Sequence, residues 1–274
     1  MNRPVPSAVD ARNNLARDAW NANAAFWDER MGEGNDFHRL LLAPALEKLL
    51  EVQPGQHILE AACGNGQLAR RLVELGASVV AFDFAPRMIE IARVRSAGQD
   101  GGITFLVLDA TDASQLRTLG PEPFDAMVCN MGFMDMAVIE PLLEAGTELL
   151  KAGGRFVFSV QHPCFNSAYA TLIAEIGDGA DGRGRAEFAL RLAGYKEQRV
   201  SYGEAVAGQP VSHLYFHRPL EELFGSFFGA GYVLDGLLEP VFSGQVRPGR
   251  GPSWYKLPGI PPVLVARMRY GLAN

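Results

Sequence analysis

The chain has 274 residues, of which 48% are hydrophobic and 20% are charged, and its formal net charge at pH 7 is −6. This length and apolar content suit one large α/β domain with additions and exclude a chain that is disordered throughout. The acidic balance disfavours nucleic acid as a partner, because tight binding of nucleic acid draws on a basic face.

Cysteine usage and hydropathy indicate the compartment. Cys63, Cys129 and Cys164 form no Cys-x-x-Cys pair, and we interpret them as buried free thiols of a reducing environment. No segment reaches the run of about 18 apolar residues that a membrane-spanning helix needs, and residues 1–10 lack a signal-like apolar run. We therefore expect a cytoplasmic protein without a membrane partner.

The N-terminal part predicts helices. Residues 1–14 are polar and contain two prolines, so we expect them to be loose. Another helix is expected over 37–50, and we assign residues 1–44 to an N-terminal helical cap. Over 15–31, four residues recur at helical spacing and form a stripe that either packs on the core or covers a ligand, namely Trp20, Ala24, Trp27 and Met31.

The middle of the chain alternates strand and helix patterns. Such alternation predicts a parallel sheet with right-handed crossovers. Strands are expected near 57–62, 78–83, 103–108, 124–130 and 155–160, and helices over 66–75, 86–95 and 139–150.

Regular patterning stops after the fifth strand. Residues 162–217 are glycine-rich, charged and aromatic without a clear period. A long irregular segment inside a compact domain is usually a lid or a binding loop, so we interpret 162–217 as a substrate-recognition insert. A helix is expected to begin at 218, followed by strands over 232–239 and 262–268.

Residues 57–83 combine a strand, a glycine turn, a helix and a second strand that ends at Asp83. A helix that opens after such a turn directs free N–H groups at a ligand. Asp83, 19 residues beyond Gly64, is placed to bond ribose hydroxyls. Gly64-x-Gly66-x-x-Ala69 also satisfies the dinucleotide fingerprint. Glu60, however, would repel a pyrophosphate and suits a ligand with an ammonium group, such as S-adenosylmethionine.

Four segments in this order resemble the motifs of the class I S-adenosylmethionine-dependent methyltransferases: 59–66, 80–88, 105–110 and 150–158. Glu60 stands where the family usually has Asp, which keeps the charge. Ala62 replaces the first glycine of the motif, a change that fits only if Ala62 avoids a positive φ.

The resemblance implies the fold and the activity. The fold is an α/β, doubly wound, Rossmann-like sheet of seven strands whose last strand is antiparallel and lies between the fifth and sixth. The core is expected over 45–274, with 162–217 as its insert. The activity is methyl transfer from S-adenosylmethionine to an N, O or C nucleophile of a small molecule, with S-adenosylhomocysteine as product.

The resemblance also implies the cofactor-binding residues. Glu60 would hold the methionyl ammonium, Asp83 the ribose diol, and Phe84 with Met88 would flank adenine. Asp109, which is alternatively a helix N-cap, would read the adenine edge together with the Ala110 N–H. The full expected set is Trp27, Glu60, Ala62, Gly64, Gly66, Asp83, Phe84, Met88, Asp109, Ala110 and Asn130.

Histidines are candidates for a general base, because their pKa lies near neutrality. His162, at the end of the fifth strand, is the best placed, and a structural histidine at a strand end is the alternative. His213 and His217 in the insert carry the same two interpretations. The histidine spacing predicts no metal site.

Two other functions share part of this pattern. An NAD-dependent oxidoreductase would use Gly64, Gly66 and Asp83 but has no need of Glu60 beside the loop. A non-catalytic S-adenosylmethionine-binding module would keep the pocket and lack an acceptor site. The sequence identifies neither the acceptor nor the oligomeric state.

Overall fold

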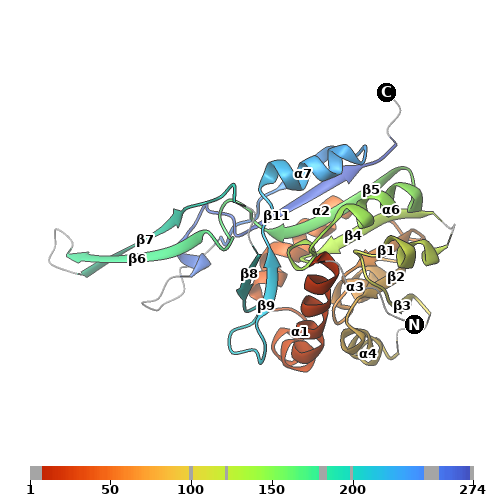
Figure 1. Ribbon diagram of the computed structural model, residues 1–274, viewed down its shortest axis with the longest axis horizontal. Coiled ribbons are helices and arrows are strands. Elements are labelled where there is room, and N and C mark those ends of the chain that lie inside the picture. The colour runs from red at the N-terminus through yellow and green to blue at the C-terminus, as the bar shows by residue number, and fades with distance from the viewer. Residues whose placement is uncertain are drawn as a thin grey trace.

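The computed structural model describes residues 8–98, 101–120, 123–178, 184–197, 200–243 and 253–271. Its centre is a seven-stranded sheet of order β10-β11-β5-β4-β1-β2-β3 (Figure 1). The last strand runs antiparallel to both of its neighbours, β5 and β10, so the predicted topology is confirmed. The strands are β1 (His57–Ala61), β2 (Ser78–Asp83), β3 (Ile103–Val107), β4 (Phe124–Asn130), β5 (Leu150–Gln161), β10 (Val233–Leu238) and β11 (Val263–Arg269).

Helices cover both faces of this sheet, which is why its inner strands are continuously apolar. Successive strand residues point to opposite faces: Ile58 packs with the first group of helices and Leu59 with the second. The first group comprises α2 (Ala43–Leu50), α3 (Gln67–Glu74) and α4 (Pro86–Arg95). The second comprises α5 (Ala113–Leu116), α6 (Glu140–Leu149) and α7 (Leu220–Gly229).

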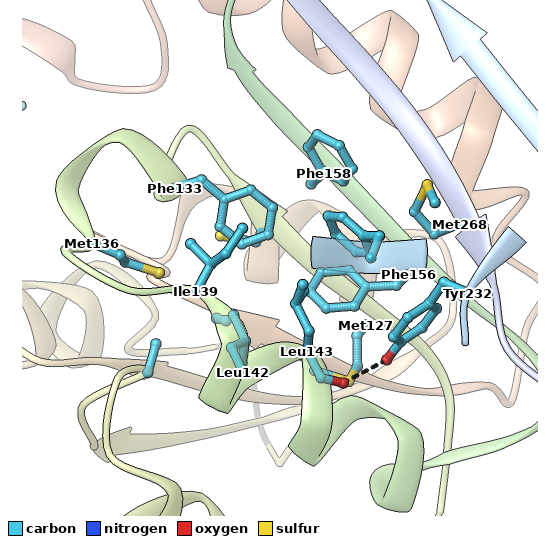
Figure 2. Packing of buried hydrophobic residues seen from close by; sticks show 14 of the residues in the cluster. Met127, Phe133, Met136, Ile139, Leu142, Leu143, Phe156, Phe158, Tyr232 and Met268 are labelled. Carbon is cyan, nitrogen blue, oxygen red and sulfur yellow. Dashed lines mark hydrogen bonds between the residues drawn. The ribbon is translucent and has the colours of Figure 1, made fainter. Parts of the chain in front are cut away.

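The core on the α6–α7 side contains a group of packed aromatic rings among aliphatic and methionine side chains (Figure 2). Phe158 stacks on Phe227 with ring centroids 4.9 Å apart, and Phe156 meets the same ring edge-on at 5.4 Å. Phe133 packs against this group from the short turn η3 (Phe133–Asp135), which follows β4. Burying such rings contributes about 1.5–3 kcal/mol each. The cluster therefore anchors η3 at the carboxyl end of the sheet.

The N-terminal helix α1 (Ala8–Met31) is longer than predicted. Residues 8–14, expected to be loose, are helical, and 1–7 lie outside the described residues. The reason is tertiary contact: the Asn13 amide donates to Thr111 Oγ1 at 2.5 Å, and its carbonyl accepts from the Ala137 N–H at 3.2 Å. The second predicted helix divides at Pro44 into a π-helical turn, η1 (His38–Leu42), and α2.

The insert is more regular than the sequence suggested. It contains two antiparallel hairpins, β6 (Ala170–Asp178) with β7 (Gly184–Leu192), and β8 (Val200–Gly203) with β9 (His213–Phe216). The β6–β7 hairpin projects away from the sheet, whereas β9 lies against α1 and η3 (Figure 1). The prediction of an irregular segment was wrong because each strand depends on a partner elsewhere in the chain.

Within the described ranges, no helix combines the length and the apolar character that crossing a membrane requires.

Candidate functional site

A cavity of about 450 Å³ opens at the carboxyl ends of β1, β2 and β4, a volume typical of small-molecule sites. The core supplies its floor, while α1, η1 and the insert supply the rest of its wall. Nine of the predicted cofactor-binding residues line it: Trp27, Glu60, Ala62, Gly64, Asp83, Phe84, Asp109, Ala110 and Asn130.

The glycine loop between β1 and α3 is fixed from several sides. The Gly64 N–H donates to Asp83 Oδ2 at 3.0 Å. The Asn65 amide donates to Asp28 of α1 at 2.8 Å, which ties the loop to the cap. Gly66 does not line the cavity; its φ is +74°, and a Cβ there would lie 2.8 Å from the Phe105 ring. Gly66 is therefore required for the turn itself.

Ala62 does not avoid the left-handed region. Its φ is +56°, a conformation that costs an L-residue about 1–2 kcal/mol. Gly132 after β4 makes this possible, because a Cβ at Gly132 would lie 2.8 Å from the Ala62 Cβ. Met131, beside Gly132, also has a positive φ of 55°. Strained backbone of this kind gathers at ligand sites, and both residues line the cavity.

Glu60 is the penultimate residue of β1, lines the cavity and is 2% exposed. Its Oε2 atom has no hydrogen-bond partner in the protein. Burial, reinforced by the nearby Asp83 carboxyl, raises the pKa of Glu60 to about 8. A buried carboxyl with an oxygen left unbonded favours a cationic ligand group, such as the predicted ammonium.

Asp83 ends β2 and shapes the loop as well as the cavity. Its second oxygen accepts from the Ala85 N–H at 2.9 Å. Burial raises the pKa of Asp83 to about 6, although the hydrogen bonds that it accepts from the two backbone N–H groups act to lower it. Asp109 also lines the cavity and accepts from the Thr111 N–H and hydroxyl at 2.8 and 2.7 Å. The N-cap of α5 is Asp112, so the N-cap alternative for Asp109 is wrong.

Phe84 lines the cavity, but Met88 does not. Met88 is 1% exposed and packs with Ala24 and Ala85 beneath the two tryptophans of α1. It holds α1 onto α4 instead of flanking a ligand. Trp27 lies over the glycine loop, since a Cβ at Gly64 would be 3.8 Å from its ring.

His162 does not line the cavity and is 2% exposed. Its Nδ1 accepts from the Cys164 N–H at 3.1 Å, and its Nε2 contacts Glu239 Oε1 at 2.8 Å. With both ring nitrogens engaged, this geometry does not support the general-base hypothesis. His213 is fully buried, and its Nε2 accepts from the Asn23 amide at 2.9 Å; the His217 Nε2 contacts the Tyr195 carbonyl at 2.8 Å.

We expect His162→Ala to lower the free energy of unfolding by about 1–3 kcal/mol. The substitution leaves the Cys164 N–H without its acceptor and removes a packed ring. The affinity for S-adenosylmethionine should stay within about twofold, since the ring is outside the cavity. Thermal melts and calorimetry measure the two effects. A large loss of affinity in a fully folded variant would contradict this assignment.

Several cavity residues were missed by sequence reasoning. Asp135 in η3 is 8% exposed, and its Oδ1 accepts from Trp20 Nε1 at 3.1 Å. The sequence could have indicated Asp135, because it is the one acidic residue in the otherwise apolar segment 131–136 after the fourth strand. His38 lines the cavity from the π-helical turn, and both of its ring nitrogens are buried without partners. Turns of this kind are frequent at functional sites.

Among the described residues, no three His, Cys, Asp or Glu side chains gather closely enough to hold a metal ion.

The sheet order, with β11 antiparallel to both of its neighbours, is that of the class I S-adenosylmethionine-dependent methyltransferase fold. Residues 58–154, in the middle of the chain, match the family model described as "Methyltransferase domain". A crystal structure of an S-adenosylmethionine dependent methyltransferase from Mesorhizobium loti has the same fold, with a TM-score of 0.64 and 22% identity over 82% of this chain and 96% of that one.

Curated relatives match part of the chain. One is a "Ubiquinone biosynthesis O-methyltransferase" of Xanthomonas campestris pv. campestris (strain B100), 34% identical over 110 residues, which are 39% of this chain and 43% of the relative. The other is a "Demethylmenaquinone methyltransferase" of Clavibacter sepedonicus, 38% identical over 105 residues, or 38% of this chain and 40% of the relative. The match therefore spans less than half the length of these relatives.

Proposed function

We propose that this protein transfers the methyl group of S-adenosylmethionine to a nucleophile of a small molecule and releases S-adenosylhomocysteine. The observation that carries the proposal is the buried Glu60 carboxyl beside the glycine loop, whose Oε2 atom has no hydrogen-bond partner in the protein. Such a group matches a ligand that brings an ammonium ion, whereas the pyrophosphate of NAD would be repelled there.

The remaining cavity residues suit the other parts of the cofactor. Asp83, at the end of β2, would accept from the ribose hydroxyls, and Phe84 would pack on adenine. Asp109 and the Ala110 N–H would bond the adenine edge, and Trp27 would cover the methionyl part. Because the sulfonium already activates the methyl group, the protein mainly aligns the nucleophile and excludes water.

The accessory segments would form the cover of this site. We propose residues 1–44 as a cap, of which 1–7 lie outside the described range, and 162–217 as an insert in the core 45–274. Trp20 and Trp27 of α1 and Tyr215 of β9 line the cavity, which supports this division. We also propose a cytoplasmic location and no nucleic-acid partner, from the acidic net charge and the free cysteines.

Calorimetry tests the cofactor. We expect S-adenosylmethionine and S-adenosylhomocysteine to bind and NAD not to bind. Glu60→Gln should lower the affinities for S-adenosylmethionine and S-adenosylhomocysteine by about 10-fold, the scale of one charged hydrogen bond. The control Glu144→Gln, at an exposed position, should leave both affinities unchanged. Tighter binding of NAD would favour the oxidoreductase. Release of S-adenosylhomocysteine with pooled acceptors then separates an enzyme from a non-catalytic module, which would bind the cofactor without turnover.

A further inference from the structure

The charges that face the cavity are all of one sign. Four carboxyl groups line it, from Glu60, Asp83, Asp109 and Asp135. None of the described residues in its wall is a lysine or an arginine, and its single imidazole, His38, has its pKa lowered by burial and by the neighbouring Arg39. A cavity of this kind attracts cationic groups and repels carboxylates.

The cofactor does not account for all four acids. In the proposed function, Glu60 meets the methionyl ammonium, Asp83 the ribose and Asp109 the adenine. Asp135 is left without a role, and the only hydrogen bond that its carboxyl group accepts in the described structure comes from a neutral donor, Trp20 Nε1. Arg218, which reaches the same turn, donates instead to the carbonyls of Phe133 and Met136 at 2.9 and 2.6 Å.

Asp135 lies where the accessory segments meet the core. Trp20 comes from α1 and Tyr215 from β9, and both line the cavity. Trp20 stacks on His213 with centroids 4.1 Å apart, and His213 meets Tyr215 edge-on at 6.2 Å. Arg218 and Phe133 fix η3 beneath them. The carboxyl group is therefore held against a rigid aromatic wall that the family core does not supply.

We propose that the methyl acceptor is a small organic amine, whose ammonium group pairs with the Asp135 carboxylate between Trp20 and Tyr215. This inference rests on the proposed function. The aromatic rings bury the hydrocarbon part of the amine, and the carboxylate gives the charge its partner.

Asp135 also has a place for the proton that the amine must lose. The bound ammonium gives one proton to the carboxylate, and burial, which raises the pKa of Asp135 to about 8, favours the neutral acid. The nitrogen lone pair then attacks the methyl carbon. The carbon–sulfur bond breaks, its electron pair stays on sulfur, and the products are the methylated ammonium and S-adenosylhomocysteine.

Three probes of the same size and different charge test the proposal: benzylamine, benzyl alcohol and benzoate. Each is titrated by calorimetry at pH 7 into protein saturated with S-adenosylhomocysteine. We expect benzylamine to bind about 10- to 100-fold more tightly than benzoate, the scale of one charged pair in a shielded site. This comparison needs no variant, so it holds whether or not a substituted protein folds.

Asp135→Asn keeps the size of the side chain and an acceptor for Trp20. The substitution should lower the affinity for benzylamine by about 10-fold or more. The affinities for benzyl alcohol and S-adenosylhomocysteine should change by no more than about twofold. Asp18→Asn is the matched control, because the Asp18 side chain on α1 is 71% exposed. Equal affinity for the three probes, or no binding of the amine, overturns the proposal.

A further outcome separates Asp135 from the cofactor. Asp135→Asn could lower the affinity for S-adenosylmethionine without changing the affinities for S-adenosylhomocysteine and benzylamine. In that case the carboxylate pairs with the sulfonium, and the amine proposal is wrong. If the unsubstituted protein binds no S-adenosylhomocysteine, it is the proposed function that fails. A titration of benzylamine against benzoate without cofactor then still shows whether the Asp135 carboxyl binds an ammonium group.

Discussion

Replacing Asp83 by alanine is expected to lower the affinity for S-adenosylmethionine by about 100-fold, or about 3 kcal/mol. Two effects add. The variant loses the acceptor for the ribose hydroxyls, and it frees the Gly64 and Ala85 N–H groups that the carboxylate holds at 3.0 and 2.9 Å. The glycine loop would then have to be ordered by the ligand itself. Calorimetry gives the affinity, and a thermal melt shows whether the variant is folded.

Asp83→Asn separates the two effects. Its carbonyl oxygen can still accept from one backbone N–H, so most of the loop geometry should persist while the charged bond to ribose is lost. We expect an intermediate affinity. A folded Asp83→Ala protein with unchanged affinity would remove this residue from the cofactor site.

The ligand-free protein is expected to lose stability between pH 6.5 and pH 8.5. Burial raises the pKa of both Glu60 and Asp135 to about 8, whereas in the unfolded chain such acids titrate near about 4. The folded state therefore holds protons that the unfolded state has released. Stability from these groups is complete below about pH 4 and is lost as the pH rises through the folded pKa. Over this interval the two groups together account for a loss of about 4 kcal/mol, or on the order of 10 °C.

Other groups do not produce this slope. Asp112, Asp125 and Asp235 have lowered pKa values, so they are ionised in the folded and the unfolded state throughout this interval and affect stability only below it. His38, His162 and His213, whose pKa values burial lowers, act with the opposite sign, and mainly below about pH 7.5. Buried Cys63 and Cys129, with pKa values raised by burial, add the same sign near the upper end.

The double variant Glu60→Gln, Asp135→Asn is the control, and its melting temperature should be nearly flat over the same interval. Saturating S-adenosylhomocysteine should also reduce the slope in the unsubstituted protein, because its ammonium group gives Glu60 a partner. An identical slope in the double variant would assign the pH dependence to other residues.

The sequence by itself determined the sheet and the cofactor end of the site. Strands such as 78–83 and 124–130 are read from local apolar runs, and the turn at Gly64 and Gly66 from the backbone freedom that only glycine supplies. Glu60 and Asp83 each follow from their position at a strand end, and strand ends meet at one edge of a parallel sheet. These inferences need only neighbours in the chain.

The tertiary structure alone decided the part of the cavity around Asp135, because its contacts join distant segments. Asp135 meets Trp20 across 115 residues, and His162 meets Glu239 across 77, which makes one a cavity acid and the other a structural ring. The positive φ of Ala62 depends on the space that Gly132 leaves beside it. The hairpins of the insert form only through pairing with partners along the chain. Local periodicity does not predict which distant residue a side chain will contact. That contact determines the burial, the pKa and the role of the side chain.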